Sequence, residues 1–458
     1  LTTGSSAGNI LFSSTVSGAN TLSTTTTGDT TFTGAIGGTP LTGLTINTAT
    51  LSAAAITLAT NTAISITNSG TGSITGIIAG TGVTLTKTGA GVLTLGGSSA
   101  STYTGGTTIK AGTVQAATNS TALGTGTVTI GDTTGTNAAS LLVSTAGLSI
   151  SNAIVLATNA SHPTLTVGTT GSLTDNVIYS GGITGTNNLT IANTVGTGKA
   201  LTFSTATINN TGTVTNTGTG AGTTTISGGI GTNVTSVTQS STTAPLSITG
   251  AVTVNSGGTT LTDTAGTLTV SGGVTGTGNV VLKNNTSTDN NLTLQTTSIN
   301  NVGTITNSGS GTGATLISGG VGSSVTGITE NSSTSALNIT TNAITVNSGG
   351  TTLTDTAGTL TVSGGVTGTG NVVLKNNTST DNNLTLQTTS INNVGTITNS
   401  GSGTGATLIS AVIGSSVTDI VQNSATSALV LSSASNAYTG VTTITAGTLK
   451  LGAAGVVP

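Results

Sequence analysis

The sequence predicts an all-β protein with essentially no helix, built as a β-solenoid, in which the chain coils repeatedly and each coil stacks on the one before. Three observations predict this fold. Apolar residues alternate with small polar residues along most of the chain. Glycine, of which there are 71 copies, interrupts nearly every window together with Asn, Ser and Thr. Long segments are also repeated in tandem. A two-residue period with many β-branched residues is typical of strands, and small polar residues favour turns over helices.

The alternation is clearest in "VTLTKT" (Val83–Thr88), "GTLTVSGG" (Gly266–Gly273) and "NLTLQTT" (Asn291–Thr297). From Gly266 onward, this alternation divides the side chains into an inward-pointing set and an outward-pointing set. We expect one set to point into the core, namely Leu268, Val270, Val274, Val280 and Leu282. We expect the other set to point outward, namely Thr267, Thr269 and Lys283.

One module is written three times between about residues 160 and 430. Thr253–Ser318 is identical to Thr345–Ser410, and a diverged copy upstream includes "SGGITGTNNLTIANT" at Ser180. Each module of about 91–92 residues could be a separate sandwich or several coils of a solenoid. No linker separates the copies, and the hairpin dipeptides Asn-Gly and Asp-Gly do not occur. These features favour a solenoid, in which a unit buries its apolar face only by stacking on its neighbour. Each module should then be four or five whole coils.

Two segments carry a more specific pattern. Lys87–Val114, "KTGAGVLTLGGSSASTYTGGTTIKAGTV", resembles the autotransporter-associated β-strand repeat of bacterial autotransporter passengers, and "ALGTGTVTIG" (Ala122–Gly131) resembles its closing strand. Ala437–Pro458 resembles the second half of the repeat, with Val441 where the motif has Gly. Gly28–Ile46 is similar to a segment of large bacterial surface adhesins.

The resemblance implies a right-handed parallel β-helix that is extracellular on a Gram-negative cell and anchored to the outer membrane through a part outside this chain. We therefore interpret the chain as a segment of a longer protein or as a relative anchored by other means. The expected organisation is one continuous solenoid, with N-terminal coils at 1–80, an autotransporter-associated β-strand repeat at 81–131, the tandem modules within 132–428 and a partial second repeat at 429–458.

Composition excludes several classes of function. Charged residues make up 3% of the chain, against roughly 25% in ordinary domains. The net charge is −3 and no arginine is present, which argues against a nucleic-acid partner. No apolar run approaches the roughly 18 residues of a membrane helix, so no transmembrane segment is expected. Cysteine is absent, which fits an exported protein and also a reducing compartment.

No catalytic, cofactor-binding or metal-binding residue is predicted, and we expect no enzyme and no cofactor. Enzymes with this fold hold clustered carboxylates, whereas the acids here are widely spaced and are interpreted as solvated turn residues. They are Asp29, Asp132, Asp175, Asp263, Asp289, Glu330, Asp355, Asp381 and Asp419. His162 is the only histidine, which excludes a two-histidine metal site or a histidine-based triad within this chain. The lysines are interpreted as scattered residues at strand edges that discourage lateral aggregation, namely Lys87, Lys110, Lys199, Lys283, Lys375 and Lys450.

Two functions remain open. The first is a surface-displayed stalk or adhesin for attachment or autoaggregation, whose partners are other copies of itself or a host or abiotic surface. The alternative is a structural protein that assembles end to end or laterally into extracellular filaments or a surface layer. A β-helix enzyme and an ice-binding threonine array are weaker interpretations, because Thr is simply a good strand residue.

Overall fold

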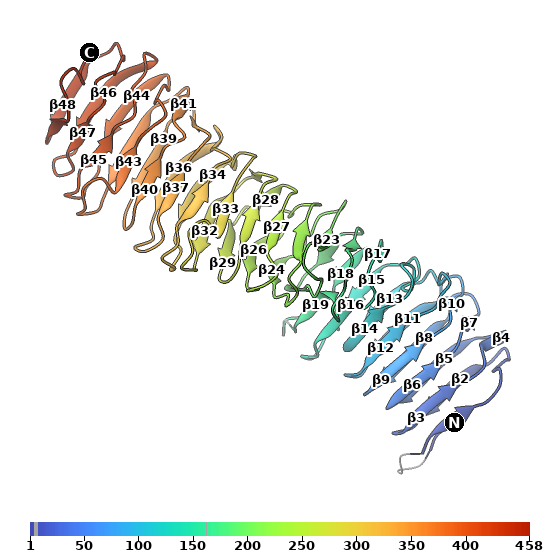
Figure 1. The fold of residues 1–458 in the computed structure, drawn as a ribbon. Helices are drawn as coiled ribbons and strands as arrows, with labels where there is room; N and C mark the ends of the chain where they lie inside the picture. Colours follow the sequence, from blue (N-terminus) through green and yellow to red (C-terminus); the bar gives the residue numbers. More distant parts are fainter. Residues whose placement is uncertain (4–7, 162) are drawn as a thin grey trace. The chain divides into compact units, whose positions relative to one another are not determined.

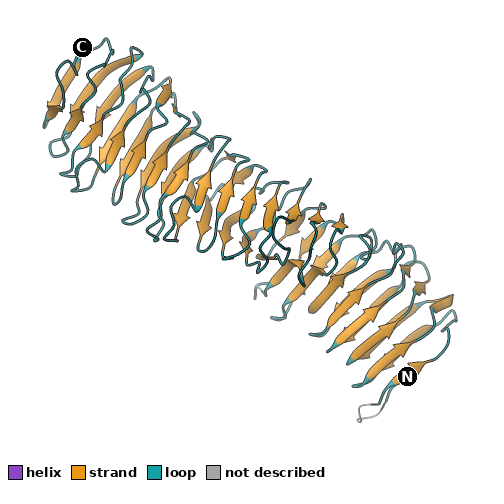
Figure 2. Cartoon of the chain, viewed as in Figure 1, coloured by secondary structure: helices purple, strands orange, loops and turns teal. Residues whose placement is uncertain are grey.

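The computed structural model describes residues 1–3, 8–161 and 163–458, and it divides the chain into two compact units, Leu1–Gly228 and Gly229–Pro458. Both are parallel β-solenoids, with about 20 turns in the chain as a whole. Every described residue lies in a strand, bridge, turn or loop, and none lies in a helix (Figures 1 and 2). The all-β prediction is therefore confirmed.

In unit 1, successive coils contribute strands to two long parallel sheets. The first, sheet 1, contains β1 (Ile10–Phe12), β3 (Asp29–Phe32), β6 (Thr50–Ala53), β9 (Thr71–Ile74), β12 (Val92–Leu95), β14 (Gly112–Ala116), β16 (Ala139–Val143), β19 (Leu165–Thr169), β22 (Leu189–Ala192) and β24 (Gly212–Asn216). The second, sheet 2, contains β2 (Thr21–Thr25), β5 (Gly43–Thr48), β8 (Ala63–Asn68), β11 (Thr84–Thr88), β13 (Thr107–Ile109), β15 (Val128–Ile130), β18 (Ile154–Leu156) and β21 (Ile183–Gly185).

Shorter strands complete the coils of unit 1. They are β4 (Ile36–Leu41), β7 (Ile56–Leu58) and β10 (Ile78–Ala79) near the N-terminus. Further along the unit they are β17 (Ser149–Ile150), β20 (Val177–Tyr179), β23 (Ala200–Phe203) and β25 (Thr223–Ile226).

Unit 2 repeats this plan more regularly. Its sheet 1 contains β26 (Val234–Gln239), β29 (Thr259–Asp263), β32 (Val280–Asn284), β34 (Gly303–Asn307), β36 (Val325–Glu330), β39 (Thr351–Asp355), β42 (Val372–Asn376), β44 (Gly395–Asn399), β46 (Val417–Asn423) and β48 (Thr442–Ala446). A second row, sheet 3, contains β27 (Leu246–Ile248), β30 (Leu268–Val270), β33 (Leu292–Leu294), β35 (Thr315–Ile317), β37 (Leu337–Ile339), β40 (Leu360–Val362), β43 (Leu384–Leu386), β45 (Thr407–Ile409), β47 (Leu429–Leu431) and β49 (Leu449–Leu451).

The third side of unit 2 is held by two short strand pairs and by single bridges. The pairs are β28 (Val252–Val254) with β31 (Val274–Gly276), and β38 (Ile344–Val346) with β41 (Val366–Gly368). Between them, bridges join Val274 to Ile299, Ile299 to Val321 and Val321 to Ile344. All of these pairings are parallel, which contradicts the hairpin-built sandwich and supports the solenoid.

The core is a column of apolar residues from alternate strand positions. In β32, Val280, Leu282 and Asn284 are buried, while the two residues between them are half-buried on the outer side. Adjacent coils align these positions, as where Leu261 pairs with Leu282. All five residues predicted to face inward are at most 1% exposed, whereas the three predicted to face outward are half-buried. Both sets are thus confirmed.

The tandem module is a whole number of coils. Asp263 ends β29, and its copy Asp355 ends β39, four coils later in sheet 1. The sequence repeat and the structural repeat therefore coincide, which confirms the expectation of four or five coils.

Candidate functional site

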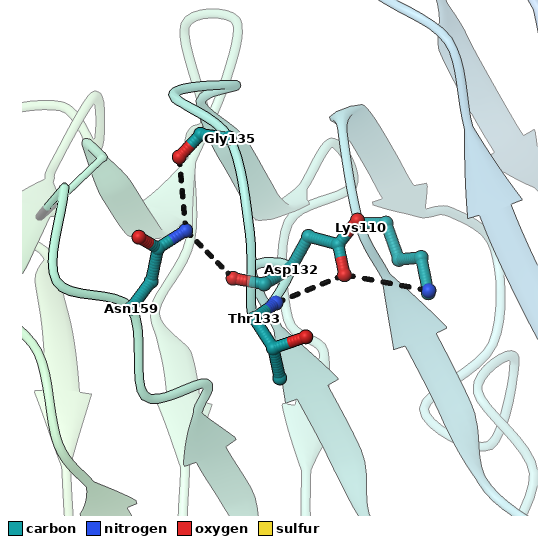
Figure 3. A network of polar contacts seen from close by, with 5 residues as sticks. All are labelled: Lys110, Asp132, Thr133, Gly135 and Asn159. Atoms are coloured by element: carbon teal, nitrogen blue, oxygen red, sulfur yellow. Dashed lines mark hydrogen bonds and ion pairs between the residues drawn. The ribbon is translucent and has the colours of Figure 1, made fainter.

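Some of the predicted turn residues fasten loops at the surface of unit 1. Asp132 follows β15, and its Oδ1 lies 3.3 Å from Nζ of Lys110 and accepts a hydrogen bond from the Thr133 amide (Figure 3). Asn159 Nδ2 donates to the carbonyl oxygens of Asp132 and Gly135 at 2.9 and 3.0 Å (Figure 3). Every polar group in this network serves the loop itself, so the network has a structural role.

A second ion pair has the same character. Lys199 Nζ lies 3.4 Å from Oδ1 of Asp175, and both side chains are largely exposed. The amide of Asn176 and the Lys199 ammonium together hold the pKa of Asp175 below its usual value. Exposed pairs of this kind contribute little to stability.

Three acids contradict the interpretation as solvated turn residues. Asp263, Glu330 and Asp355 are 0% exposed. Each is the last residue of a sheet 1 strand and continues that strand's inward set, as Asp263 does after Thr259 and Leu261. The alternation of the strand, rather than the charge of the side chain, decides which way these residues point.

These acids belong to a buried row that we call the polar ladder. It is formed by one fully buried polar residue from each sheet 1 strand from β26 to β46, which is the last residue of the strand or, in β46, the residue before the last. Its members are Gln239, Asp263, Asn284, Asn307, Glu330, Asp355, Asn376, Asn399 and Gln422. Strand register pairs Asp263 with Asn284, Asn307 with Glu330, and Glu330 with Asp355.

The amide members of the ladder satisfy carbonyl groups of the turns. Asn284 Nδ2 donates to the carbonyl oxygens of Gly313 and Ala314 in the next coil at 3.1 and 3.0 Å. Asn307 Nδ2 donates to Oε2 of Glu330 at 2.8 Å and to the carbonyl of Ser335 at 2.7 Å. Because buried carbonyl groups need partners, these bonds help to hold the turns that follow the sheet 1 strands.

The carboxyl members are less well matched to their surroundings. Glu330 accepts from Asn307 and from the Ser332 amide, and burial, with a smaller contribution from the Asp355 charge, raises its pKa to about 8. Burial raises the pKa of Asp263 to about 7 and that of Asp355 to about 6. Oδ2 of both aspartates is buried without a hydrogen-bond partner. Enclosed in the core, these groups have no access to a substrate.

Lys87 also departs from its interpretation as a strand-edge residue. It is 0% exposed, and its Nζ donates to the carbonyl oxygens of Thr88 and Gly89 at 2.6 and 2.7 Å. A longer bond of 3.4 Å reaches the carbonyl of Ala111 in the next coil. The residue therefore fastens a turn of unit 1 from inside. Lys283 and Lys375, in contrast, are half-buried on the outer side of their strands.

The outer surface offers shallow, uncharged depressions. Two equivalent ones of about 420 Å³ lie in unit 2 and are lined by Asn, Gly, Thr and Val, including Asn279 in one and Asn371 in the other. Beside them runs the outer threonine row, Thr306, Thr329 and Thr354, in direct register on β34, β36 and β39. These surfaces can offer hydroxyl and amide groups for hydrogen bonding but no charge.

The described residues contain no group of three or more side chains that could hold a metal ion. His162 lies outside the described residues. No described helix is long and apolar enough to cross a membrane.

Segments 85–116 and 426–451 match the sequence model of the passenger-associated-transport-repeat. The chain is thus a parallel β-solenoid that carries repeats typical of autotransporter passenger domains. Repeats of this family are typical of surface-exposed passengers, and such repeats and such a fold are typically non-catalytic. Comparison with curated proteins and with solved structures gives no match.

Proposed function

We propose that this solenoid is a surface-displayed stalk that mediates attachment to surfaces or aggregation of the cells that carry it. The passenger-type repeats support the surface location. The observation that carries the adhesive role is the outer threonine row, in which half-buried hydroxyl groups repeat from coil to coil in register. Each contact would be weak, and many acting together would supply the strength.

The low charge of the chain sets the character of this binding. Six lysines and nine acids in 458 residues leave most of the outer surface neutral. Salt screens interactions between exposed charges and has little effect on hydrogen bonds between neutral groups. Attachment through this surface should therefore change little between low and high ionic strength.

The test is to display the full chain on a non-adherent cell and to compare it with a chain that lacks 253–344. This deletion removes four coils and joins Val252 to Thr345, a junction that matches the native Ile344–Thr345 step. We expect clumping or surface attachment to fall by more than the lost fraction of length. Equal attachment by both chains, at equal display levels, would contradict a multivalent stalk.

A matched variant distinguishes the effect of the outer hydroxyl groups from the effect of chain length. Substituting Thr306, Thr329 and Thr354 together with Val keeps the shape and β-branching of the row but removes its hydroxyl groups. We expect weaker attachment with unchanged folding. Electron microscopy of the purified chain tests the alternative, because ordered fibres would favour a structural assembly and separate particles would favour the stalk.

A further inference from the structure

The position of Glu330 in the polar ladder is occupied by glutamine in both neighbouring modules, as Gln239 and Gln422. Gln422 shows what the site requires. Its Oε1 accepts from Asn399 at 2.8 Å, and its Nε2 donates to the carbonyl oxygens of Ser424 and Ser427 at 3.0 and 2.9 Å. The site therefore needs one acceptor and one donor.

Glu330 supplies the acceptor in the same way, because its Oε2 accepts from Asn307 at 2.8 Å. Its Oε1 accepts from the Ser332 amide at 2.6 Å, whereas the nitrogen of Gln422 donates to the carbonyl oxygens of Ser424 and Ser427. Unlike the neutral amide of glutamine, a carboxyl group can carry a negative charge, which is costly at a position that is 0% exposed. Complete burial therefore favours the protonated side chain of Glu330.

The surroundings of Glu330 provide no positive charge. The strand on one side, β34, contributes Asn307, and the strand on the other side, β39, contributes Asp355. The facing strand in the same coil, β37, contributes apolar side chains. The nearest lysines in register are Lys283 on β32 and Lys375 on β42, each two strands away and on the outer side of its strand. Two fully buried carboxyl groups in adjacent coils, Glu330 and Asp355, cannot both ionise without a large cost.

We propose that protonation of the polar ladder stabilises unit 2. In the folded state Glu330, Asp263 and Asp355 carry protons, and the coils around β36 and β39 loosen when these protons are lost. Oδ2 of Asp263 and Oδ2 of Asp355 are also buried without a hydrogen-bond partner, so a negative charge on either side chain would be poorly compensated. This proposal does not depend on what the outer surface binds.

The direction of the pH effect follows from linkage. Burial raises the folded-state pKa values of the three acids to about 6, 7 and 8, above those of the same groups in an unfolded chain. Folded unit 2 therefore binds more protons than the unfolded chain between about pH 4 and 8. The stability that these groups contribute to unit 2 is fully present at pH values below their unfolded-state pKa values. It is lost as the pH rises through their folded-state pKa values. Each group can change the unfolding constant by up to about tenfold per pH unit within its window.

The experiment is amide hydrogen exchange on the full chain at pH 5 and pH 8.5, corrected for intrinsic exchange rates. Peptides within 319–344, which include β36, can be assigned uniquely because this stretch lies outside the two identical copies. We expect protection of β36 to fall at least tenfold from pH 5 to pH 8.5. Glu330→Gln, which installs the residue of the neighbouring modules, should remove most of that fall.

Two further variants make the result decisive. Gln422→Glu should create a new loss of protection at β46 in alkaline solution, because it places an ionisable group in the equivalent site. Asp289→Asn removes an exposed acid of the same unit and should leave the pH dependence of β36 unchanged. The proposal is overturned if the wild-type chain is equally protected at both pH values, or if Glu330→Gln retains the full pH dependence.

Discussion

The phenolic oxygen of Tyr103 lies 2.6 Å from Oγ1 of Thr107, and Tyr438 lies at the same distance from Thr442. Both threonines begin a strand, β13 in one case and β48 in the other. Both pairs lie in segments that match the passenger-associated-transport-repeat. The motif Y-T-G-x-T therefore ties the loop before a strand to the first residue of that strand.

Replacing Tyr103 with Phe should lower the free energy of unfolding of unit 1 by about 1 kcal/mol, because the buried Thr107 hydroxyl loses its short bond and keeps only a 3.5 Å contact with the Leu123 carbonyl, while the ring remains packed. The check is the denaturant midpoint. Thr108→Val, at the half-buried neighbouring position, is the control and should change the midpoint little. An unchanged midpoint in Tyr103→Phe would show that the hydroxyl pair has no role in stability.

The inward set of β30 gives a second prediction. Leu268→Asp would bury an unpaired charge in the core and should cost several kcal/mol, on the order of 3 or more. Thr269→Asp, one residue later on the half-buried outer side, should cost less than about 1 kcal/mol. Urea unfolding of both variants measures the difference, and equal destabilisation would mean that the two faces are reversed.

A third prediction concerns how closely adjacent coils approach. A Cβ atom on Gly311 would lie 1.9 Å from the carbonyl oxygen of Thr286 in the preceding coil. Gly311→Ala must therefore push two coils apart, and we expect a loss of about 1–3 kcal/mol. Gly327→Ala is the matched control, because its Cβ would meet nothing closer than 3.5 Å. Thermal melting of the two variants should separate them clearly, and similar melting temperatures would contradict the close stacking.

Lys87 gives a pH effect of opposite sign to that of the polar ladder. Burial lowers its pKa to about 8, so between about pH 8 and 10.5 the unfolded chain binds more protons than folded unit 1. The stability around β11 should therefore rise with pH in this window. Amide exchange of β11 at pH 7.5 and 9.5, corrected for intrinsic rates, checks this, with Lys87→Met as the variant that should remove the rise. A decrease in protection of wild-type β11 would refute it.

Much of the fold was predictable because period two is set by the backbone. The alternation "TLTV" at Thr267–Val270 assigns inward and outward positions before any contact is known, and tandem copies that cannot be separated favour whole coils. The third side was harder to predict. Ile299 and Val321 make single bridges there, because only isolated residues of the turns align between coils.

The sequence alone does not reveal the buried acids, because a charged side chain by itself predicts solvent exposure. The sequence signal that could have identified them is their position in the two-residue alternation of the strand. Asp263 is in step with Leu261, Glu330 with Ile328, and Lys87 with Leu85, so each belongs to the inward set of its strand. The pKa shifts, in contrast, depend on neighbours in other coils, such as Asp355 beside Glu330. They cannot be predicted from the sequence without knowing which residues are paired between coils.

The two exact copies in unit 2 are continuous coils of one solenoid rather than separate domains. The chain has no cysteine, so Ser287→Cys and Ser379→Cys introduce two unique label sites at exposed, equivalent positions four coils apart in unit 2. With strands spaced about 4.8 Å apart, pulsed dipolar spectroscopy on spin labels at these sites should give one narrow distance near 20 Å. Two separate globular modules would place the labels about 35 Å apart or more, with a broad distribution, and that result would contradict the account.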